Sequence, residues 1–304
     1  MEHLPDLEQF ERGVQMSGFE TGDRQSVPPF TCYLIGRDSF LIPCGEVLLA
    51  RNCQILGIIS TGESIVSWAN NYNIPWIEPT DDLYKFLSQE PCDYLFSISN
   101  SIILTQEIID LPKRGAINCH DALLPKYRGL NAPAWAIFYR EPIHGVTWHR
   151  VTTQIDGGDI LKQGSFQLDD DETTLSLSVR CYEEILKLFE TLVDELATDK
   201  VTIAKQDLAR RSYFGRTHKP TPGCILSWSW SAEQIEAMVR SLTFGDYENS
   251  IGLPKLAIGN ELIIVTEVAI LDVRSQSPAG SIVEIGCSRL TIATASNDLL
   301  LLAV

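Results

Sequence analysis

Three side chains that suit group transfer occur close together in this sequence. Asn118 and His120 lie at alternate positions at the end of an apolar run that begins at Ala116, and Asp156 follows downstream before two glycines. In a β-strand alternate side chains point to the same face, so Asn118 and His120 should face one way while Cys119 faces the other. An imidazole moves protons, an amide donates to a developing oxyanion, and a carboxylate orients and charges the imidazole. The pattern therefore predicts one site for group transfer.

A longer motif surrounds these residues. Asn-Cys-His at 118–120 is followed by Leu-Leu-Pro-Lys-Tyr-Arg-Gly at 123–129, Gly-Val-Thr at 145–147 and Asp-Gly-Gly-Asp at 156–159. In this order the elements resemble the motif of the folate-dependent formyltransferase family: Asn-x-His, Leu-Leu-Pro-x-x-Arg-Gly, Gly-Val-Thr and Asp-x-Gly-Asp. The resemblance extends from about Phe30 to the end of the sequence. It implies that 10-formyltetrahydrofolate donates a formyl group to a primary amine.

The resemblance also implies roles for individual residues. Asn118, His120 and Asp156 match the family's catalytic residues: the amide and the protonated imidazole hold the formyl oxygen, and the carboxylate charges the imidazole. A cis peptide bond between Leu124 and Pro125 is expected, since the family bends sharply here. No metal is required. The segments that match the family's folate contacts are Ile102, Ile103 and Leu104, together with Thr152, Thr153, Gln154, Ile155 and Asp156.

The same residues have ordinary structural interpretations. Asn118 could cap the end of a strand, and Asp156 could form a turn before its two glycines. Within one motif, an oxyanion donor and a carboxylate beside the imidazole are the better interpretation. His144 and His149 lack the spacing of metal ligands, so we interpret both as structural.

The charge of the chain limits its partners. Its 304 residues include 24 lysines and arginines against 40 aspartates and glutamates, which gives a formal net charge of −16. Proteins that grip a nucleic acid present a basic face, because neutralising phosphates releases counterions. The net field would repel a polyanion and disfavours tRNA. A local basic patch is compatible with the sequence around Arg210, Arg211, Arg216, His218 and Lys219.

The lack of a targeting signal in the sequence and the spacing of the cysteines indicate a cytoplasmic protein. No apolar run reaches the length of a membrane span, and the acidic first residues lack the basic-then-apolar order of a signal peptide. The eight cysteines are scattered and include no Cys-x-x-Cys pair. This spacing indicates reduced thiols and no zinc site. The sequence therefore predicts a cytoplasmic location with neither a membrane partner nor a metal.

Short apolar runs alternate with helical patterns over much of the chain. Residues 30–35, 55–59 and 94–98 are typical of buried strands, and residues 173–197 carry apolar side chains at helical spacing. This alternation predicts an α/β fold with a Rossmann-like open parallel sheet, whose active loops lie at the carboxyl ends of its strands. The formyltransferase fold implied by the resemblance is of this kind. A Gly-x-Gly-x-x-Gly loop is absent, which argues against a dinucleotide.

A second unit follows the long helix. Ser231 and Gln234 fit a capping box that opens a helix, and five strand-like runs come after it. Short strands in this number predict a small barrel, and the resemblance implies an OB-like C-terminal domain. We therefore expect an N-terminal extension at 1–29, a formyltransferase catalytic domain at 30–205, a linker at 206–222 and an OB-like domain at 223–304.

Three acceptor amines are compatible with this family. Residues 242–247 and 252–255 look like the branch associated with nonribosomal peptide synthetases, and the apolar last residues suggest adjoining synthetase domains beyond Val304. The expected partners are therefore formyl-folate and an aminoacyl group on a peptidyl-carrier domain. A nucleotide-linked amino sugar is the alternative acceptor, and methionyl-tRNA comes third.

Two other classes of protein remain to be distinguished. A formyl-folate hydrolase would use the same three residues on water, but such enzymes carry a sensing domain ahead of the catalytic one, and residues 1–29 are too short for it. A binding module without catalysis is disfavoured by the intact set of Asn118, His120 and Asp156.

Overall fold

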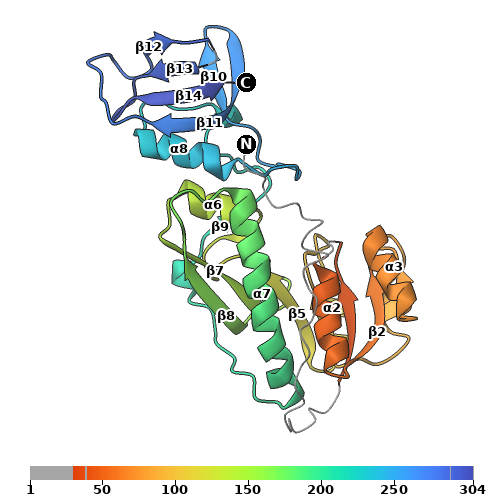
Figure 1. Ribbon diagram of the computed structural model, residues 1–304. Coiled ribbons are helices and arrows are strands. Elements are labelled where there is room, and N and C mark those ends of the chain that lie inside the picture. Colours follow the sequence, from red (N-terminus) through yellow and green to blue (C-terminus); the bar gives the residue numbers. More distant parts are fainter. Residues whose placement is uncertain (1–29, 38–39, 288, 304) are drawn as a thin grey trace, which may run out of the picture.

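A mixed seven-stranded sheet forms the centre of the larger unit (Figure 1). The computed structural model describes residues 30–37, 40–287 and 289–303, so the predicted extension at 1–29 lies outside the described residues. The strands follow the order β3-β2-β1-β4-β5-β7-β8 across the sheet. Their bounds are Thr31–Ile35 (β1), Gln54–Ile59 (β2), Trp76–Ile77 (β3), Tyr94–Ser97 (β4), Gly115–His120 (β5), Ile143–Arg150 (β7) and Ile160–Gln167 (β8).

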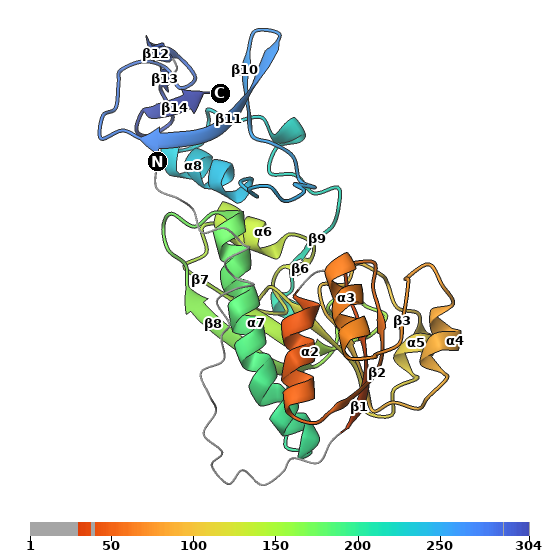
Figure 2. The ribbon, with the colours of Figure 1, turned by 45° about the vertical axis from the view of Figure 1, so that its right-hand side comes forward.

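Helices cover both faces of this sheet (Figure 2). One buried cluster joins the sheet to α2, α3 and α7, and a second cluster joins the opposite face to α4 and α5. The predicted α/β class is confirmed. The bounds are Leu41–Ala50 (α2), Glu63–Asn71 (α3), Leu83–Leu87 (α4), Gln106–Ile109 (α5) and Thr174–Ala197 (α7).

Strand β1 shows why the apolar runs are continuous. Cys32 and Leu34 belong to the cluster under α2 and α7, whereas Tyr33 and Ile35 belong to the cluster under α4 and α5. Successive side chains of a strand point to opposite faces, so a strand covered on both sides is apolar at every position. The run at 30–35 predicts such a strand, and the structure confirms it.

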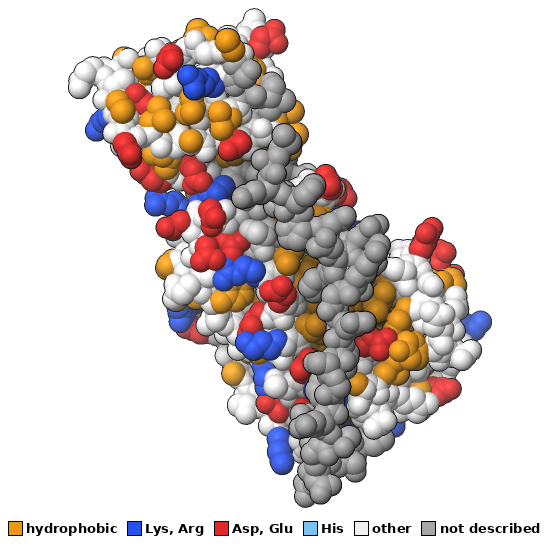
Figure 3. Space-filling view, viewed as in Figure 1, with side chains coloured by type: hydrophobic (Ala, Val, Ile, Leu, Met, Phe, Trp, Pro, Cys, Tyr) orange, Lys and Arg blue, Asp and Glu red, His pale blue; other side chains and the backbone are white. Residues whose placement is uncertain are grey.

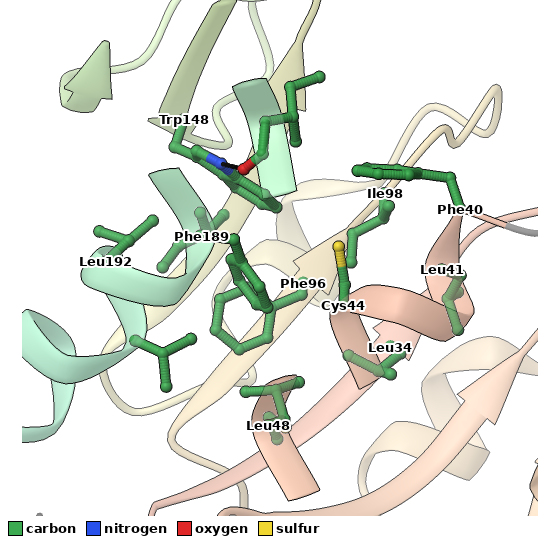
Figure 4. Close-up of a cluster of buried hydrophobic side chains, with 14 of the residues drawn as sticks. Leu34, Phe40, Leu41, Cys44, Leu48, Phe96, Ile98, Trp148, Phe189 and Leu192 are labelled. Carbon is green, nitrogen blue, oxygen red and sulfur yellow. Dashed lines mark hydrogen bonds between the residues drawn. The ribbon is translucent and has the colours of Figure 1, made fainter. Parts of the chain in front are cut away.

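Aromatic side chains hold α7 against the middle of the sheet (Figure 4). Phe189 stacks on Trp148 of β7 with ring centroids 4.6 Å apart, and it meets Phe96 of β4 edge-on at 5.2 Å. The buried indole nitrogen of Trp148 donates to the main-chain oxygen of Ile185 at 3.0 Å, so this polar atom is satisfied. Because β4 and β7 are the neighbours of β5, these contacts fix the two strands that flank Asn118 and His120.

The sheet departs from a purely parallel arrangement at one side. Strands β3, β2, β1, β4 and β5 pair in parallel, whereas β7 runs antiparallel to β5 and β8 antiparallel to β7. After β5 the chain turns back through residues 121–142 and re-enters the sheet beside β5 in the reverse direction. The loop 151–159, which joins β7 to β8, carries Asp156.

The C-terminal unit is a five-stranded antiparallel sheet covered by one helix. The order β10-β11-β14-β13-β12 leaves β10 and β12 as edges. The five predicted strands are therefore confirmed, but they form a half-barrel, and no pairing among the described residues joins β10 to β12. The bounds are Ala232–Ser241 (α8), Lys255–Ile258 (β10), Glu261–Ile270 (β11), Ile282–Ile285 (β12), Arg289–Ile292 (β13) and Leu299–Ala303 (β14).

Helix α8 explains why this sheet stays open. It begins with the predicted capping box, in which the side chain of Ser231 accepts from the main-chain amide of Gln234. Its apolar side packs against one face of the half-barrel, so the helix buries the surface that a closed barrel would bury within itself. The other face remains in solvent, and Figure 3 shows hydrophobic side chains gathered on this unit. Exposed members on β11 and β12 are Leu262, Ile264, Ile270, Ile282, Val283 and Ile285.

A shared cluster of buried side chains connects the two units. It joins Ala122 and Tyr127 of the loop after β5, Trp135 of α6 (Ala132–Phe138), and the side chains of α8 and the half-barrel. The segment 206–222, predicted as a linker, packs against the same loop. Its strand β9 (Tyr213–Phe214) pairs in parallel with β6 (Arg128–Gly129), and Phe214 stacks on Trp135 at 4.5 Å.

Three general features bear on cofactors and location. All eight cysteines are free thiols. Within the described residues, no group of three or more His, Cys, Asp and Glu side chains could hold a metal ion. No helix in this part of the chain has the length and apolar character needed to cross a bilayer.

Candidate active site

Strand β5 presents its functional side chains as its alternation predicts. Ile117 lies in the cluster under α7, and Cys119 packs against the same cluster. Asn118 and His120 therefore project from the opposite face of the sheet, towards the loops that follow β5 and β7. The prediction that Cys119 faces away from these two residues is confirmed.

His120 is buried and has partners on both ring nitrogens. Its side chain is 7% exposed, and Nε2 lies 2.7 Å from the main-chain oxygen of Tyr127. A carbonyl only accepts, so Nε2 carries the hydrogen in this contact. Nδ1 lies 3.5 Å from a carboxylate oxygen of Asp121, and Nε2 lies 3.8 Å from Oδ2 of Asp156. The imidazole is thus placed between two carboxylates.

The carboxylate of Asp156 lies between two histidines. Oδ2 accepts from the Gly129 amide at 2.7 Å, and Oδ1 lies 3.5 Å from Nε2 of His149. Burial opposes its ionisation, but the charge of His120, the neighbouring His149 and the Gly129 amide hold the pKa of Asp156 well below its usual range. Asp156 has a positive φ of 49°, a conformation that aspartate adopts more readily than most residues. The side chain is therefore a fixed anion in the site.

The electrostatics of His120 follow from its two carboxylate neighbours. Burial by itself lowers the pKa of His120, but Asp156, Asp121 and the Tyr127 carbonyl outweigh it and raise the pKa above its ordinary value. The site thus favours an imidazolium, which can hold a developing negative charge on a substrate oxygen.

Asn118 joins this cluster through His149. Its Oδ1 accepts from the hydroxyl of Ser97 at 2.9 Å, and its Nδ2 donates to the Cys119 carbonyl at 2.9 Å. Nδ2 also lies 3.2 Å from Nε2 of His149. Nδ1 of His149 donates to the Arg150 carbonyl at 2.9 Å, because a carbonyl only accepts. His149 therefore contacts both the amide and the carboxylate of the predicted site.

The sequence interpretation, which treated His149 as structural, did not identify its contacts with Asn118 and Asp156. His149 pairs directly with Asn118 across β5 and β7, and Thr147 pairs with His120. Sequence spacing does not reveal this, because the register of an antiparallel pair is set by the fold. The available signal was the alternation along β7: Val146 and Trp148 belong to the core under α7, which places Thr147 and His149 on the face of His120.

The Gly-Val-Thr segment holds the loop that follows β5. A Cβ on Gly145 would lie 2.0 Å from the main-chain oxygen of Gly164, so only glycine allows β7 and β8 to approach this closely. Thr147 donates to the Ala122 carbonyl at 2.6 Å and accepts from the Leu124 amide at 3.2 Å. These bonds fasten the loop beside His120.

The predicted bend of this loop is present. The Leu124–Pro125 peptide bond is cis, as the resemblance implied. The carbonyl of Leu124 accepts from Nε2 of Gln163 on β8 at 3.1 Å, so β8 also holds the bend.

The segments expected to contact folate lie in two loops at the site. Ile102, Ile103 and Leu104 follow β4, where Nδ2 of Asn100 lies 3.3 Å from Oγ of Ser97, the residue that orients Asn118. Ile103 is 76% exposed. In the other loop, residues 152–155 are exposed and Asp156 points inwards. Leu104 is buried in the cluster under α4 and α5, whereas the exposed apolar side chains of Ile103 and Ile155 suit the flat face of a pterin ring.

Comparisons with known proteins agree with this site. Residues 78–192, which include Asn118, His120 and Asp156, match the family model described as formyl transferase. The bifunctional polymyxin resistance protein ArnA of Wigglesworthia glossinidia brevipalpis is 34% identical over 175 residues, which cover 57% of this chain and 25% of that protein. The match thus spans a quarter of the length of this curated relative.

Solved structures share the fold of most of the chain. WlaRD, a sugar 3N-formyl transferase crystallised with dTDP and 5-N-formyl-THF, is 19% identical with a TM-score of 0.72, covering 90% of this chain and 98% of that one. The N-formyltransferase from Helicobacter canadensis, in complex with folinic acid and dTDP-3-aminofucose, is 18% identical with a TM-score of 0.71, covering 91% and 100%. At these identities the likeness shows the fold. The motif, the family model over residues 78–192 and the shared fold all agree with the resemblance to the formyltransferases.

Proposed function

We propose that this protein is an N-formyltransferase that moves the formyl group of 10-formyltetrahydrofolate to a primary amine. The observation that carries the proposal is the cluster on one face of the sheet: the Asp156 carboxylate lies 3.8 Å from His120 and 3.5 Å from His149, and His149 lies 3.2 Å from the Asn118 amide. The cluster combines a charged proton donor, a neutral amide donor and a fixed anion. Acyl transfer to an amine uses these three groups.

The chemistry needs no covalent intermediate on the protein. The amine nitrogen attacks the formyl carbon, the new C–N bond forms, and the bond between that carbon and N10 of the folate breaks. Negative charge on the formyl oxygen is held by the imidazolium of His120 and the amide of Asn118. His120 gives a proton to the leaving nitrogen and regains one from the attacking amine, so one proton moves from the amine to N10. Asp156 keeps the imidazole charged.

The acceptor we propose is a nucleotide-linked amino sugar. The sequence by itself favoured an aminoacyl group on a carrier domain, but the similar solved structures are of sugar N-formyltransferases, one crystallised with dTDP and another with dTDP-3-aminofucose. No relative named above supports the carrier domain. The net charge of −16 still argues against tRNA as the acceptor.

A direct assay tests both the reaction and the acceptor. The purified chain is supplied with 10-formyltetrahydrofolate and one of three acceptors: a dTDP-linked amino sugar, an aminoacyl thioester of phosphopantetheine, or methionyl-tRNA. We expect mass spectrometry to find the formylated sugar nucleotide, with stoichiometric release of tetrahydrofolate. Formylation of the thioester or the tRNA in preference to the sugar would contradict the proposed acceptor. Release of formate without any formylated acceptor would instead identify a hydrolase.

Replacing Asp121 by asparagine should change the pH dependence of the reaction. The active form has His120 protonated, so activity falls as pH rises through the pKa of His120. Asp121 raises that pKa, and its loss should move the alkaline limb of the kcat profile to lower pH while leaving the plateau below the limb nearly unchanged. The profile is measured beside Asp110→Asn, a change at the exposed residue that follows α5. An unmoved limb in Asp121→Asn would show that Asp121 does not charge His120.

A further inference from the structure

The start of the segment 206–222 reaches the loop that carries Asp156. Gln206 lies after β8 and α7 in sequence, yet its side chain contacts three groups beside His120. Nε2 donates to the main-chain oxygens of Asp156 at 2.8 Å and Gly158 at 2.6 Å. Oε1 accepts from Nη2 of Arg128 at 2.6 Å. One amide therefore bridges the loop 151–159 and the loop after β5.

The chemistry of these partners requires an amide. Both partners of Nε2 are carbonyl oxygens, which only accept, and the partner of Oε1 is a guanidinium, which only donates. These partners therefore determine which atom of the Gln206 amide is the nitrogen and which is the oxygen. In this orientation the side chain makes all three hydrogen bonds at once. A glutamate would set a carboxylate oxygen against two carbonyls. A lysine would serve the carbonyls but set its charge against Arg128.

Arg128 depends on this contact. The residue is 6% exposed, and its Nε has no hydrogen-bond partner in the described part of the chain. Its guanidinium would otherwise be a buried charge with few acceptors, which is costly. Gln206 supplies an acceptor to it, and Arg128 in turn fixes Gln206 beside Gly129, whose amide binds the Asp156 carboxylate.

The loop needs such support, because its conformation is an unusual one. Asp156 has a φ of 49°, and a Cβ on Gly158 would lie 1.9 Å from the main-chain oxygen of Arg150. Left-handed backbone at a residue other than glycine is strained and persists where neighbouring groups hold it in place. The bonds from Gln206 flank Asp156 at its own carbonyl and at that of Gly158, and so oppose relaxation of the turn.

We propose that Gln206 is a positioning residue of the reaction: by bridging Arg128 to the carbonyls of Asp156 and Gly158, it holds the Asp156 carboxylate beside His120. Gln206 does not touch the reacting atoms. Its effect passes through Asp156, whose distance from His120 determines how strongly it charges the imidazole. The inference concerns the site of the proposed N-formyltransferase, and its first test does not depend on that activity.

The first test measures the titration of His120 by NMR. The charged or titratable groups around the ring are Asp121 beside it, Asp156 from the loop after β7, Arg128 from β6, and His144 and His149 from β7. Of these, Gln206 holds only Asp156 and Arg128. Gln206→Met removes all three bonds at nearly constant volume, so Asp156 is released and the pKa of His120 should fall towards its value in Asp156→Asn. An unchanged titration in folded Gln206→Met would refute the proposal.

A second variant separates the two ends of the amide. Gln206→Glu keeps an acceptor for Arg128 but replaces the donor to the two carbonyls by an oxygen. If the donor bonds hold the loop, this variant should also lower the pKa of His120, even though it adds a negative charge nearby that by itself would raise it. A rise of the pKa, with Asp156 still paired to His120, would overturn the proposal. Gln206→Glu also provides the test if Gln206→Met does not fold.

Kinetics provide the second readout. Displacing a catalytic group by about 1 Å costs up to about 10²-fold in rate, so Gln206→Met should lower kcat by about 10- to 100-fold and leave KM for the amine within about threefold. In an Asp156→Asn background the same change should cost less than about twofold, because Gln206 acts through Asp156. Equal losses in both backgrounds would identify a general structural role instead.

The matched control is Gln234→Met. Gln234 completes the capping box of α8, away from the site, so its loss should lower thermal stability without changing kcat or the His120 titration. If wild-type protein shows no formyl transfer, the proposed function fails. The NMR test still decides whether Gln206 positions Asp156.

Discussion

Replacing His120 by alanine is expected to lower kcat by about 10²–10⁴-fold, the usual loss when a positioned proton donor is removed. The imidazole is the one charged donor in the cluster, and Asp156 and Asp121 are placed to keep it protonated. The measurement is the rate of formylated product at saturating formyl-folate and acceptor. Thermal unfolding is followed alongside, because removal of a buried side chain also lowers stability.

The control for this variant is His218→Ala. His218 is exposed and lies in the segment 206–222, so its loss should leave the rate within about twofold. Turnover near the wild-type rate in a folded His120→Ala protein would remove His120 from the mechanism. Asn118 would then be the remaining proposed donor at the formyl oxygen.

Asp156→Asn should cause the second large loss, at least about 100-fold in kcat. The asparagine keeps the shape of the side chain and an oxygen that accepts from the Gly129 amide, so the loop should remain in place. What disappears is the negative charge beside His120 and His149. The pKa of His120 should therefore fall, and residual activity should be lost at a lower pH on the alkaline side than in the wild type.

A neighbouring carboxylate provides the matched control. Asp159 belongs to the same loop, but its side chain makes no hydrogen bond or ion pair with the residues that the structure describes; only its main-chain oxygen is used, by the Arg150 amide at 2.9 Å. Asp159→Asn should retain most of the activity. If both variants lose activity alike, the loop itself matters and the Asp156 carboxylate has no special role.

The candidate site could be predicted from sequence to the extent that it follows local rules. Strand alternation placed Asn118 and His120 on one face with Cys119 on the other, and the motif pointed to Asp156. His149 could not be identified in this way. Its contact with Asn118 depends on the register of β5 against β7, and a shift of one residue would turn His149 to the core.

Gln206 could not be identified from the sequence either, because its partners lie far away along the chain. A polar residue after a long helix reads as the start of a linker, and nothing in its neighbours indicates a buried partner. Its three bonds exist because the chain returns past the sheet and pairs β9 with β6, which brings residue 206 beside residues 128 and 156. Contacts of this kind depend on the path of the whole chain, which the conformational preferences of neighbouring residues do not determine.

The sequence by itself determined the local structure and the chemistry of this protein. Hydrophobic periodicity specified the strands, α7 and the five C-terminal strands, because burial demands apolar side chains at the period of each element. The tertiary structure decided what depends on long-range pairing: the antiparallel β7 and β8, the open half-barrel covered by α8, and the linkage of Asp156 to His120, His149 and Gln206. Such pairings arise only when distant segments compete to bury the same surfaces and satisfy the same polar groups.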